Sequence, residues 1–177
     1  SNVDTSKQNA FLIDMTKCTG CRGCQVACKQ WNQLEAENTE FFSGEGYQNP
    51  PAMSEYTFTR IKFRDYEKNG QNEFAFYKEM CMHCDDPACA SVCPVGAFEK
   101  TAAGPVVYKA DRCIGCRFCM IACPFGVPKY EWSKGLPLVK KCTGCYDRIS
   151  AGLQPACATA CPTAITYGTP DKMLKIA

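Results

Sequence analysis

Four cysteines lie close together in the second half of the 177-residue chain, and their spacing restricts the fold more than any other feature. The stretch reads Cys113-Ile-Gly-Cys116-Arg-Phe-Cys119-Met-Ile-Ala-Cys123-Pro124. Two-residue gaps let one tight loop direct three thiolates at three corners of a single iron–sulfur cube, and the fourth cysteine lies beyond the reach of that loop. Pro124 ends the helical turn, because proline has no N–H to donate. The spacing predicts an iron–sulfur protein.

The chain contains sixteen cysteines, and every one belongs to a group of four. The other three groups are Cys18, Cys21, Cys24 and Cys28; Cys81, Cys84, Cys89 and Cys93; and Cys142, Cys145, Cys157 and Cys161. Composition alone allows a disulfide-rich secreted protein, a zinc protein or an iron–sulfur protein. Zinc ribbons place two C-x-x-C pairs well apart without a third cysteine two residues on, and runs of four are redox or metal sites more often than disulfides. We therefore expect four 4Fe–4S clusters, with zinc as the alternative.

The ligands of each cluster follow from the rule for two-cluster bacterial ferredoxins, in which the fourth cysteine of a run ligates the other cube. Cluster a is predicted to use Cys18, Cys21, Cys24 and Cys161, and cluster b Cys142, Cys145, Cys157 and Cys28. Cluster c is predicted to use Cys81, Cys84, Cys89 and Cys123, and cluster d Cys113, Cys116, Cys119 and Cys93.

The segments that flank the cysteine groups repeat as well. Apolar stretches at 10–13 and 106–108 precede the first and third groups, and stretches at 97–98 and 164–167 follow the second and fourth. Each strand before one run is expected to pair with the strand after the other run. The prediction is an α+β fold of two nested ferredoxin-like modules, each binding two clusters. The outer module comprises 1–28 and 142–177, the inner module 81–123, and 124–141 is a linker.

Residues 29–80 form an insert between the first two groups. Residues 25–37 are expected to be helical, with Trp31 and Leu34 on one face, and Ser43 to Pro51 is expected to be a loop. Residues 56–66 and 73–78 flank Lys68-Asn69-Gly70, and Asn-Gly is a strong β-hairpin signal. The expected role of the insert is scaffold and subunit-contact surface.

Several other residues are candidates for a role beside the clusters. His83, the only histidine, lies between two ligands, and we expect it to hydrogen-bond to backbone, cluster sulfur or a partner rather than to bind metal. Lys140 and Lys141 either offset cluster charge or lie at the surface. Trp31 and Trp132 are expected in the core. No nucleophile pair and no Gly-rich nucleotide motif is present, so no catalytic residue is predicted.

Charge and hydropathy exclude some partners. The formal charge of +2 does not suggest a nucleic-acid partner, and four oxidised clusters on sixteen thiolates make the holoprotein about −6. No apolar run approaches the ~20 residues that cross a bilayer, so no transmembrane segment is expected. Residues 1–4 do not resemble a signal peptide, which alone favours the cytoplasm, although a subunit exported with a signal-bearing partner also lacks one.

The chain resembles, over nearly its whole length, the electron-transfer subunits of the molybdenum/tungsten bis-pterin oxidoreductases, and in particular the beta subunit of formate dehydrogenase. The resembling stretches are Cys18–Trp31, Gln48–Pro51, Cys81–Cys84 with Asp86-Pro87, Cys123–Pro128, Lys141–Cys145 with Asp147-Arg148, and Pro155–Cys157 through Gly168-Thr169. Membrane-bound relatives carry a C-terminal transmembrane helix. The sequence ends at Ala177 without such a helix. We therefore expect either that the chain serves a soluble heterodimer or that the transmembrane segment was lost or is not included.

The resemblance implies a function and partners. It implies that the chain relays electrons between a large molybdenum- or tungsten-pterin catalytic subunit, which interconverts formate and CO2, and an external acceptor such as a cytochrome or a quinone-linked membrane subunit. It implies a periplasmic location by co-export with the catalytic subunit, with the cytoplasm as the alternative. The outer module is expected to face the catalytic subunit and cluster d to be outermost. A subunit of another bis-pterin oxidoreductase and a freestanding polyferredoxin remain the alternatives.

Overall fold

The computed structural model describes residues 3–4, 6–41 and 46–177. Residues 43–45 of the predicted loop at Ser43–Pro51 therefore lie outside the described residues. The strands are β1 (Ala10–Ile13), β2 (Arg60–Lys68), β3 (Gln71–Glu79), β4 (Phe98–Lys100), β5 (Val106–Tyr108), β6 (Lys129–Tyr130), β7 (Val139–Lys140) and β8 (Ile165–Gly168). The helices are α1 (Gly23–Trp31), α2 (Ala88–Ser91), α3 (Phe118–Ala122), α4 (Tyr146–Ser150), α5 (Ala156–Ala160) and α6 (Pro170–Ile176).

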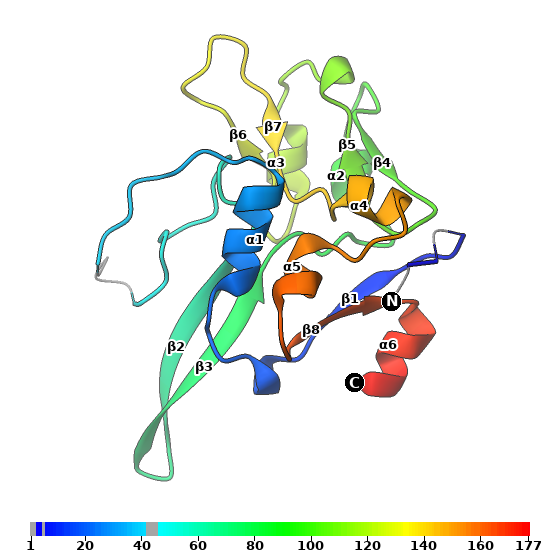
Figure 1. The fold of residues 1–177 in the computed structure, drawn as a ribbon. Coiled ribbons are helices and arrows are strands. Elements are labelled where there is room, and N and C mark those ends of the chain that lie inside the picture. Colours follow the sequence, from blue (N-terminus) through cyan, green and yellow to red (C-terminus); the bar gives the residue numbers. More distant parts are fainter. Residues whose placement is uncertain (1–2, 5, 42–45) are drawn as a thin grey trace.

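The strands form four antiparallel pairs (Figure 1). β1 pairs with β8, which is 152 positions away where Ile13 lies opposite Ile165. β4 pairs with β5, with Phe98 opposite Tyr108. Both pairs are those that the repeated flanks of the cysteine groups predict. α1 packs against α5 and α2 against α3, so each of these two sheets is accompanied by a pair of short helices.

The predicted β-hairpin of the insert is present, with its first strand shorter and its second strand longer than expected. β2 and β3 pair over nine residues each, from Arg60 opposite Glu79 to Lys68 opposite Gln71. Asn69 and Gly70 both have positive φ, the conformation that a two-residue hairpin turn requires. The prediction started the first strand too early, because residues 54–57 close a separate small turn through the Ser54–Thr57 bridge. In Figure 1 the hairpin extends away from the remaining elements as a long arm.

The helix predicted at 25–37 is shorter in the structure. α1 ends at Trp31, and Asn32 caps it: the Asn32 N–H makes the last helical bond to the carbonyl of Cys28 at 3.1 Å, and the Asn32 side-chain amide donates to the same carbonyl at 2.8 Å. Gln33 then takes a left-handed φ of 51°, which stops the helical path. The predicted face shared by Trp31 and Leu34 is therefore wrong, since Leu34 lies beyond the helix.

The described apolar core is divided into small clusters, and cysteines are members of three of them. One combines Cys24, Ile61, Cys157 and Ile165, and a second combines Cys28, Phe58, Met80 and Cys142. A third surrounds Cys119 with Ala97, Phe98, Val106 and Val139. Because Val139 of β7 is fully buried there, the predicted linker 124–141 contains a β6–β7 hairpin that packs on the core.

The described helices are short. The longest, α1, has nine residues, less than half of the ~20 that a bilayer-spanning helix requires, and none of the helices described outside positions 1–2, 5 and 42–45 qualifies as a membrane span.

Candidate metal centres

The four C-x-x-C loops share one backbone geometry. The residue just before the second cysteine has a positive φ in each loop, namely Gly20 (68°), His83 (47°), Gly115 (72°) and Gly144 (67°). This conformation turns the chain so that the two cysteines of the loop face the same side. Three loops use glycine for it, as expected, because a side chain at a left-handed position costs about 1–2 kcal/mol. The second loop uses His83 instead.

Backbone N–H groups point at several of the sulfurs. The amides of His83, Gly115 and Gly144 lie 3.5, 3.4 and 3.4 Å from the Sγ of the first cysteine of their loop. The amides of Ala97 and Ala164 lie 3.2 Å from the Sγ of Cys93 and Cys161. Donors of this kind stabilise negative charge on sulfur and are a means by which proteins tune iron–sulfur clusters.

All sixteen cysteines are free, and the predicted ligand sets stay a prediction. Cys18, Cys21, Cys24 and Cys161 line one small cavity. Besides burial, the pKa of Cys28 is raised by Cys142, Cys145 and Cys157, and that of Cys89 by Cys81, Cys123 and Cys84. The pKa of Cys119 is raised by burial and then by Cys113, Cys116, Cys89 and Cys93, so thiols of the second and third groups lie near one another. The second and fourth cysteine groups also approach each other, because Cys142 raises the pKa of Cys81 and Cys81 packs on the core cluster of Cys28 and Cys142.

Burial makes many of these thiols difficult to ionise. It raises the pKa of Cys24 and Cys119 to about 11 and that of Cys145 to about 12, and it raises the pKa of Cys28 further, with additional effects from neighbouring cysteines. Buried thiolates need positive charge beside them. Iron provides that charge when soft thiolate ligands bind it, and the chain adds buried lysines.

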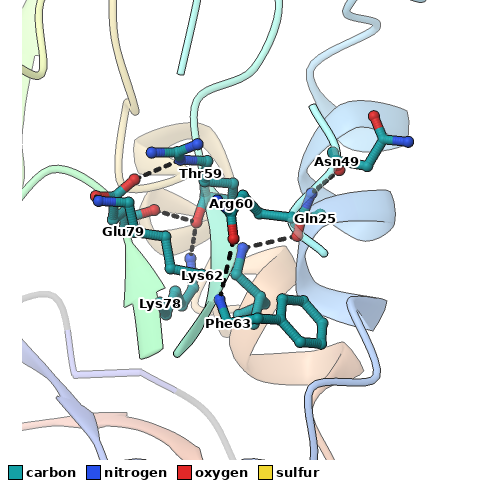
Figure 2. A network of polar contacts seen from close by, with 10 residues as sticks. Gln25, Asn49, Thr59, Arg60, Lys62, Phe63, Lys78 and Glu79 are labelled. Carbon is teal, nitrogen blue, oxygen red and sulfur yellow. Dashed lines mark hydrogen bonds and ion pairs between the residues drawn. The ribbon is translucent and has the colours of Figure 1, made fainter. Parts of the chain in front are cut away.

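Lys78 of β3 is one of these cations, and sequence reasoning missed it. Its side chain is buried (6 % exposed), its ammonium donates to Thr59 Oγ1, and it lowers the pKa of Cys24, Cys28 and Cys142 against the effect of burial. Figure 2 shows Lys78 and Thr59 beside the Arg60–Glu79 ion pair of the hairpin. The insert is therefore more than scaffold. The alternation of β3 is the only sequence signal that could have placed Lys78 inside.

The side chains of His83 and Lys141 lie where the second and fourth cysteine groups meet in space. His83 is buried (8 % exposed), its Nδ1 accepts the Val106 N–H at 3.0 Å, and its Nε2 is 3.5 Å from Cys142 Sγ. The expected bond to backbone or ligand sulfur is confirmed. Burial, and then Lys141, Lys100 and Lys78, lowers the pKa of His83 well below its usual value, so the ring is neutral.

The two lysines that the sequence could not separate have different surroundings. Lys141 is buried (5 % exposed) and its Nζ lies 2.8 Å from the Cys142 carbonyl and 3.9 Å from Cys81 Sγ, so it offsets charge near the ligands. Lys140 is partly exposed and its Nζ lies 3.8 Å from Glu131.

The tryptophans are not in the core, contrary to prediction. Trp132 is 65 % exposed and Trp31 is 42 % exposed. Trp31 donates from Nε1 to Asp147 at 2.8 Å, and the guanidinium of Arg148 lies 4.3 Å from its ring centre. This arrangement joins α1 to α4 at the surface.

Exposure differs between the cysteines. Cys21 and Cys116 are the two exposed ones, and they belong to the first and third groups. Cys28, Cys142, Cys145 and Cys157 are all buried. Several exposed apolar side chains lie near Cys116 in the sequence, namely Ile114, Phe118, Ile121 and Phe125.

Buried cysteine groups with N–H donors and counter-charges fit 4Fe–4S clusters and define an iron–sulfur protein of the ferredoxin type. Two models described as 4Fe-4S dicluster domains match residues 17–97 and 72–169, and the chain belongs to this family. Two dicluster domains and sixteen cysteines correspond to four 4Fe–4S clusters.

Curated relatives agree with this. The nitrate-inducible formate dehydrogenase iron–sulfur subunit of Escherichia coli (strain K12) is 42% identical over 176 residues, 98% of this chain and 58% of the relative. The formate dehydrogenase iron–sulfur subunit of Haemophilus influenzae is 38% identical, over 96% of this chain and 54% of the relative. The B subunit of the anaerobic dimethyl sulfoxide reductase of E. coli is 41% identical, over 95% and 77%. The chain thus spans little more than half the length of the formate dehydrogenase relatives, and the predicted resemblance to this group is confirmed.

Proposed function

We propose that the chain is the electron-transfer subunit of a formate dehydrogenase, between a molybdenum- or tungsten-pterin subunit and an external acceptor such as a cytochrome or a quinone-linked partner. Oxidation of formate to CO2 and a proton releases two electrons. Each 4Fe–4S cluster, when bound, supplies a one-electron centre, so the pair leaves in two successive steps. The observation that carries the proposal is the placement of one exposed cysteine in each of two groups, Cys21 and Cys116, while the cysteines predicted for the two clusters between them are buried or half-buried.

We assign the ligands as the sequence predicts. The shared cavity of Cys18, Cys21, Cys24 and Cys161 supports cluster a, and the mutual proximity of Cys28, Cys142, Cys145 and Cys157 supports cluster b. The neighbours of Cys89 and of Cys119 support clusters c and d. The order a, b, c, d then places the exposed ligands Cys21 and Cys116 at the two ends of the relay.

The nested division into modules is part of the proposal. The pairing of β1 with β8 and the packing of α1 on α5 support an outer module of 1–28 and 142–177, and the β4–β5 and α2–α3 contacts support an inner module of 81–123. The matched family models divide the chain sequentially instead, at 17–97 and 72–169. The β6–β7 hairpin at 124–141 belongs with the inner core that it contacts.

The proposed direction places the catalytic subunit at cluster a and the acceptor at cluster d. α1 and the hairpin arm lie beside cluster a and offer a large contact surface there. The exposed apolar side chains Ile114, Phe118, Ile121 and Phe125, which flank Cys116 in the sequence, are typical of a protein-docking surface.

Two observations test the proposal. Purification of the native complex should yield a large pterin-containing subunit whose activity identifies the substrate. With Cys116→Ser, formate should still reduce the other three clusters while turnover with the physiological acceptor falls. Failure of those clusters to reduce would place cluster d upstream.

A dimethyl sulfoxide reductase is the second candidate, because the B subunit of that enzyme is matched over more of its length than the formate dehydrogenase subunits are. Reduction of dimethyl sulfoxide by the purified complex, without formate oxidation, would select it. A carrier that purifies without any catalytic subunit would instead be the freestanding polyferredoxin. The periplasmic location stays a prediction, which fractionation of the native host tests.

A further inference from the structure

The loops that carry Cys81 and Cys142 contact each other reciprocally through one side chain each. His83 belongs to the Cys81 loop but reaches the sulfur of Cys142, with Nε2 3.5 Å from Sγ. Lys141 directly precedes Cys142 but reaches the sulfur of Cys81, with Nζ 3.9 Å from Sγ. Each loop therefore supplies a polar side chain to the other loop's first cysteine.

The backbone of Val106 fixes both side chains. Its N–H donates to His83 Nδ1 at 3.0 Å, and its carbonyl accepts from Lys141 Nζ. A ring nitrogen that accepts a hydrogen bond carries no proton, so the proton of His83 is on Nε2 and points at Cys142. Lys141 is held by a second carbonyl, that of Cys142 at 2.8 Å, which leaves one ammonium proton for Cys81.

His83 has an unfavourable backbone conformation for a residue with a side chain. It occupies the left-handed position that Gly20, Gly115 and Gly144 occupy in the other three loops. A histidine there gives up backbone stability relative to glycine, because residues with a side chain disfavour a left-handed φ. The contacts with Val106 and Cys142 are what the side chain gains at this position.

We propose that His83 and Lys141 are reciprocal positioning residues at the junction of the two modules, where His83 sets the reduction potential of cluster b and Lys141 that of cluster c. The inference rests on the ligand sets of the proposed function. A donor or a cation at a ligand sulfur stabilises the additional negative charge of the reduced cluster and raises its potential. These reciprocal contacts raise the potentials of the two facing clusters together, so that neither becomes a barrier to an electron that crosses between modules.

The experiment is a potentiometric titration of the cluster-loaded protein, followed by electron paramagnetic resonance. His83→Asn is the main variant, since asparagine tolerates left-handed backbone and is too short to reach Cys142. At the wild-type midpoint, the ratio of reduced to oxidised cluster b should fall roughly fivefold, as expected for one lost hydrogen bond. Cluster c, whose own loop carries the substitution, should change less. His83→Gln retains a donor the same number of bonds from the backbone and should restore cluster b.

Lys141→Met should give the converse result, a larger fall for cluster c than for cluster b. Lys100→Met is the matched control, because Lys100 donates to the His83 carbonyl at 2.8 Å and contacts no ligand sulfur in the described structure. It should move both clusters less than either test variant. If His83→Asn shifts cluster c as much as cluster b, distortion of the loop explains the shift and the inference is overturned.

Separate variants distinguish this failure from failure of the ligand sets. Cys145→Ser should alter only the signal of cluster b, and Cys89→Ser only that of cluster c. If each changes the other signal, the ligand sets are wrong and the crossed assignment falls with them. If the ligand variants behave as expected and His83→Asn leaves cluster b unmoved, the inference alone is overturned.

Discussion

Gly104 lies directly against the main chain of Asn9. A Cβ on Gly104, whose φ is 115°, would overlap the carbonyl oxygen of Asn9 and lie 3.0 Å from its nitrogen. The adjacent Ala103 accepts a hydrogen bond from the Asn9 amide at 3.0 Å. The turn between β4 and β5 is thus attached to the segment that leads into β1, and it joins the two halves of the fold.

Replacement of Gly104 should loosen this attachment. Gly104→Ala adds both a disfavoured φ and an overlap with backbone, and we expect a loss of about 3 kcal/mol. Thermal loss of the clusters, followed by their visible absorbance, should begin at clearly lower temperature. Gly126→Ala is the control, because Gly126 also has a positive φ (59°) but its Cβ would meet no atom within 4 Å. Equal effects of the two substitutions would contradict the close approach.

Lys78 should set the potentials of clusters a and b. Lys78→Met removes a buried cation that favours the thiolates of Cys24, Cys28 and Cys142, and the ratio of reduced to oxidised cluster at the wild-type midpoint should fall roughly fivefold for both. Lys62→Met is the control, since Lys62 pairs with Glu79 at 2.8 Å on the hairpin. A uniform shift of all four clusters would indicate a general charge effect instead.

Glu79 should contribute stability that depends on pH. Burial acts to raise the pKa of Glu79, but hydrogen bonds from Lys62 and Arg60 lower it overall below 4.5. A lowered folded-state pKa means that the contribution is present above about pH 4.5 and is lost as pH falls through the folded value. Glu79→Gln should therefore cost about 1–2 kcal/mol at pH 7 and progressively less towards pH 3. A difference from wild type that stays constant over this range would contradict the shift.

The clusters should be required for folding. The apolar core is divided among small clusters that contain Cys24, Cys28, Cys119, Cys142 and Cys157, so the apoprotein lacks a continuous core and metal-site energy is folding energy. The loaded chain should contain about sixteen irons and about sixteen sulfides. Anaerobic removal of iron should abolish most of the circular dichroism signal. A native-like spectrum of the apoprotein is the contradicting outcome.

The cysteine spacing predicted much of this molecule because the ligand geometry of a cube leaves few alternatives. The pairing of β1 with β8 followed from the repeated flanks of the cysteine groups, and the turn at Asn69-Gly70 followed from a local dipeptide signal. The end of α1 did not, because it depends on the bond from the Asn32 side chain to Cys28, which helix periodicity does not reveal. The burial of Lys78 and Lys141 also depends on packing between distant segments. A lysine in a sequence is ordinarily expected at the surface, so its residue type alone could not predict that either side chain is buried.

The strand register also orders events during synthesis. β1 is made early, yet its partner β8 emerges about 150 residues later, on the order of ten seconds at ribosomal rates. β4 and β5 adjoin in sequence and can pair as soon as residue 108 has left the ribosome. Cellular iron–sulfur loading should therefore complete the centres around 81–123 before residues 142–161, which the first four cysteines need, have been made. A nascent chain arrested before residue 142 should hold iron only at the centres around 81–123.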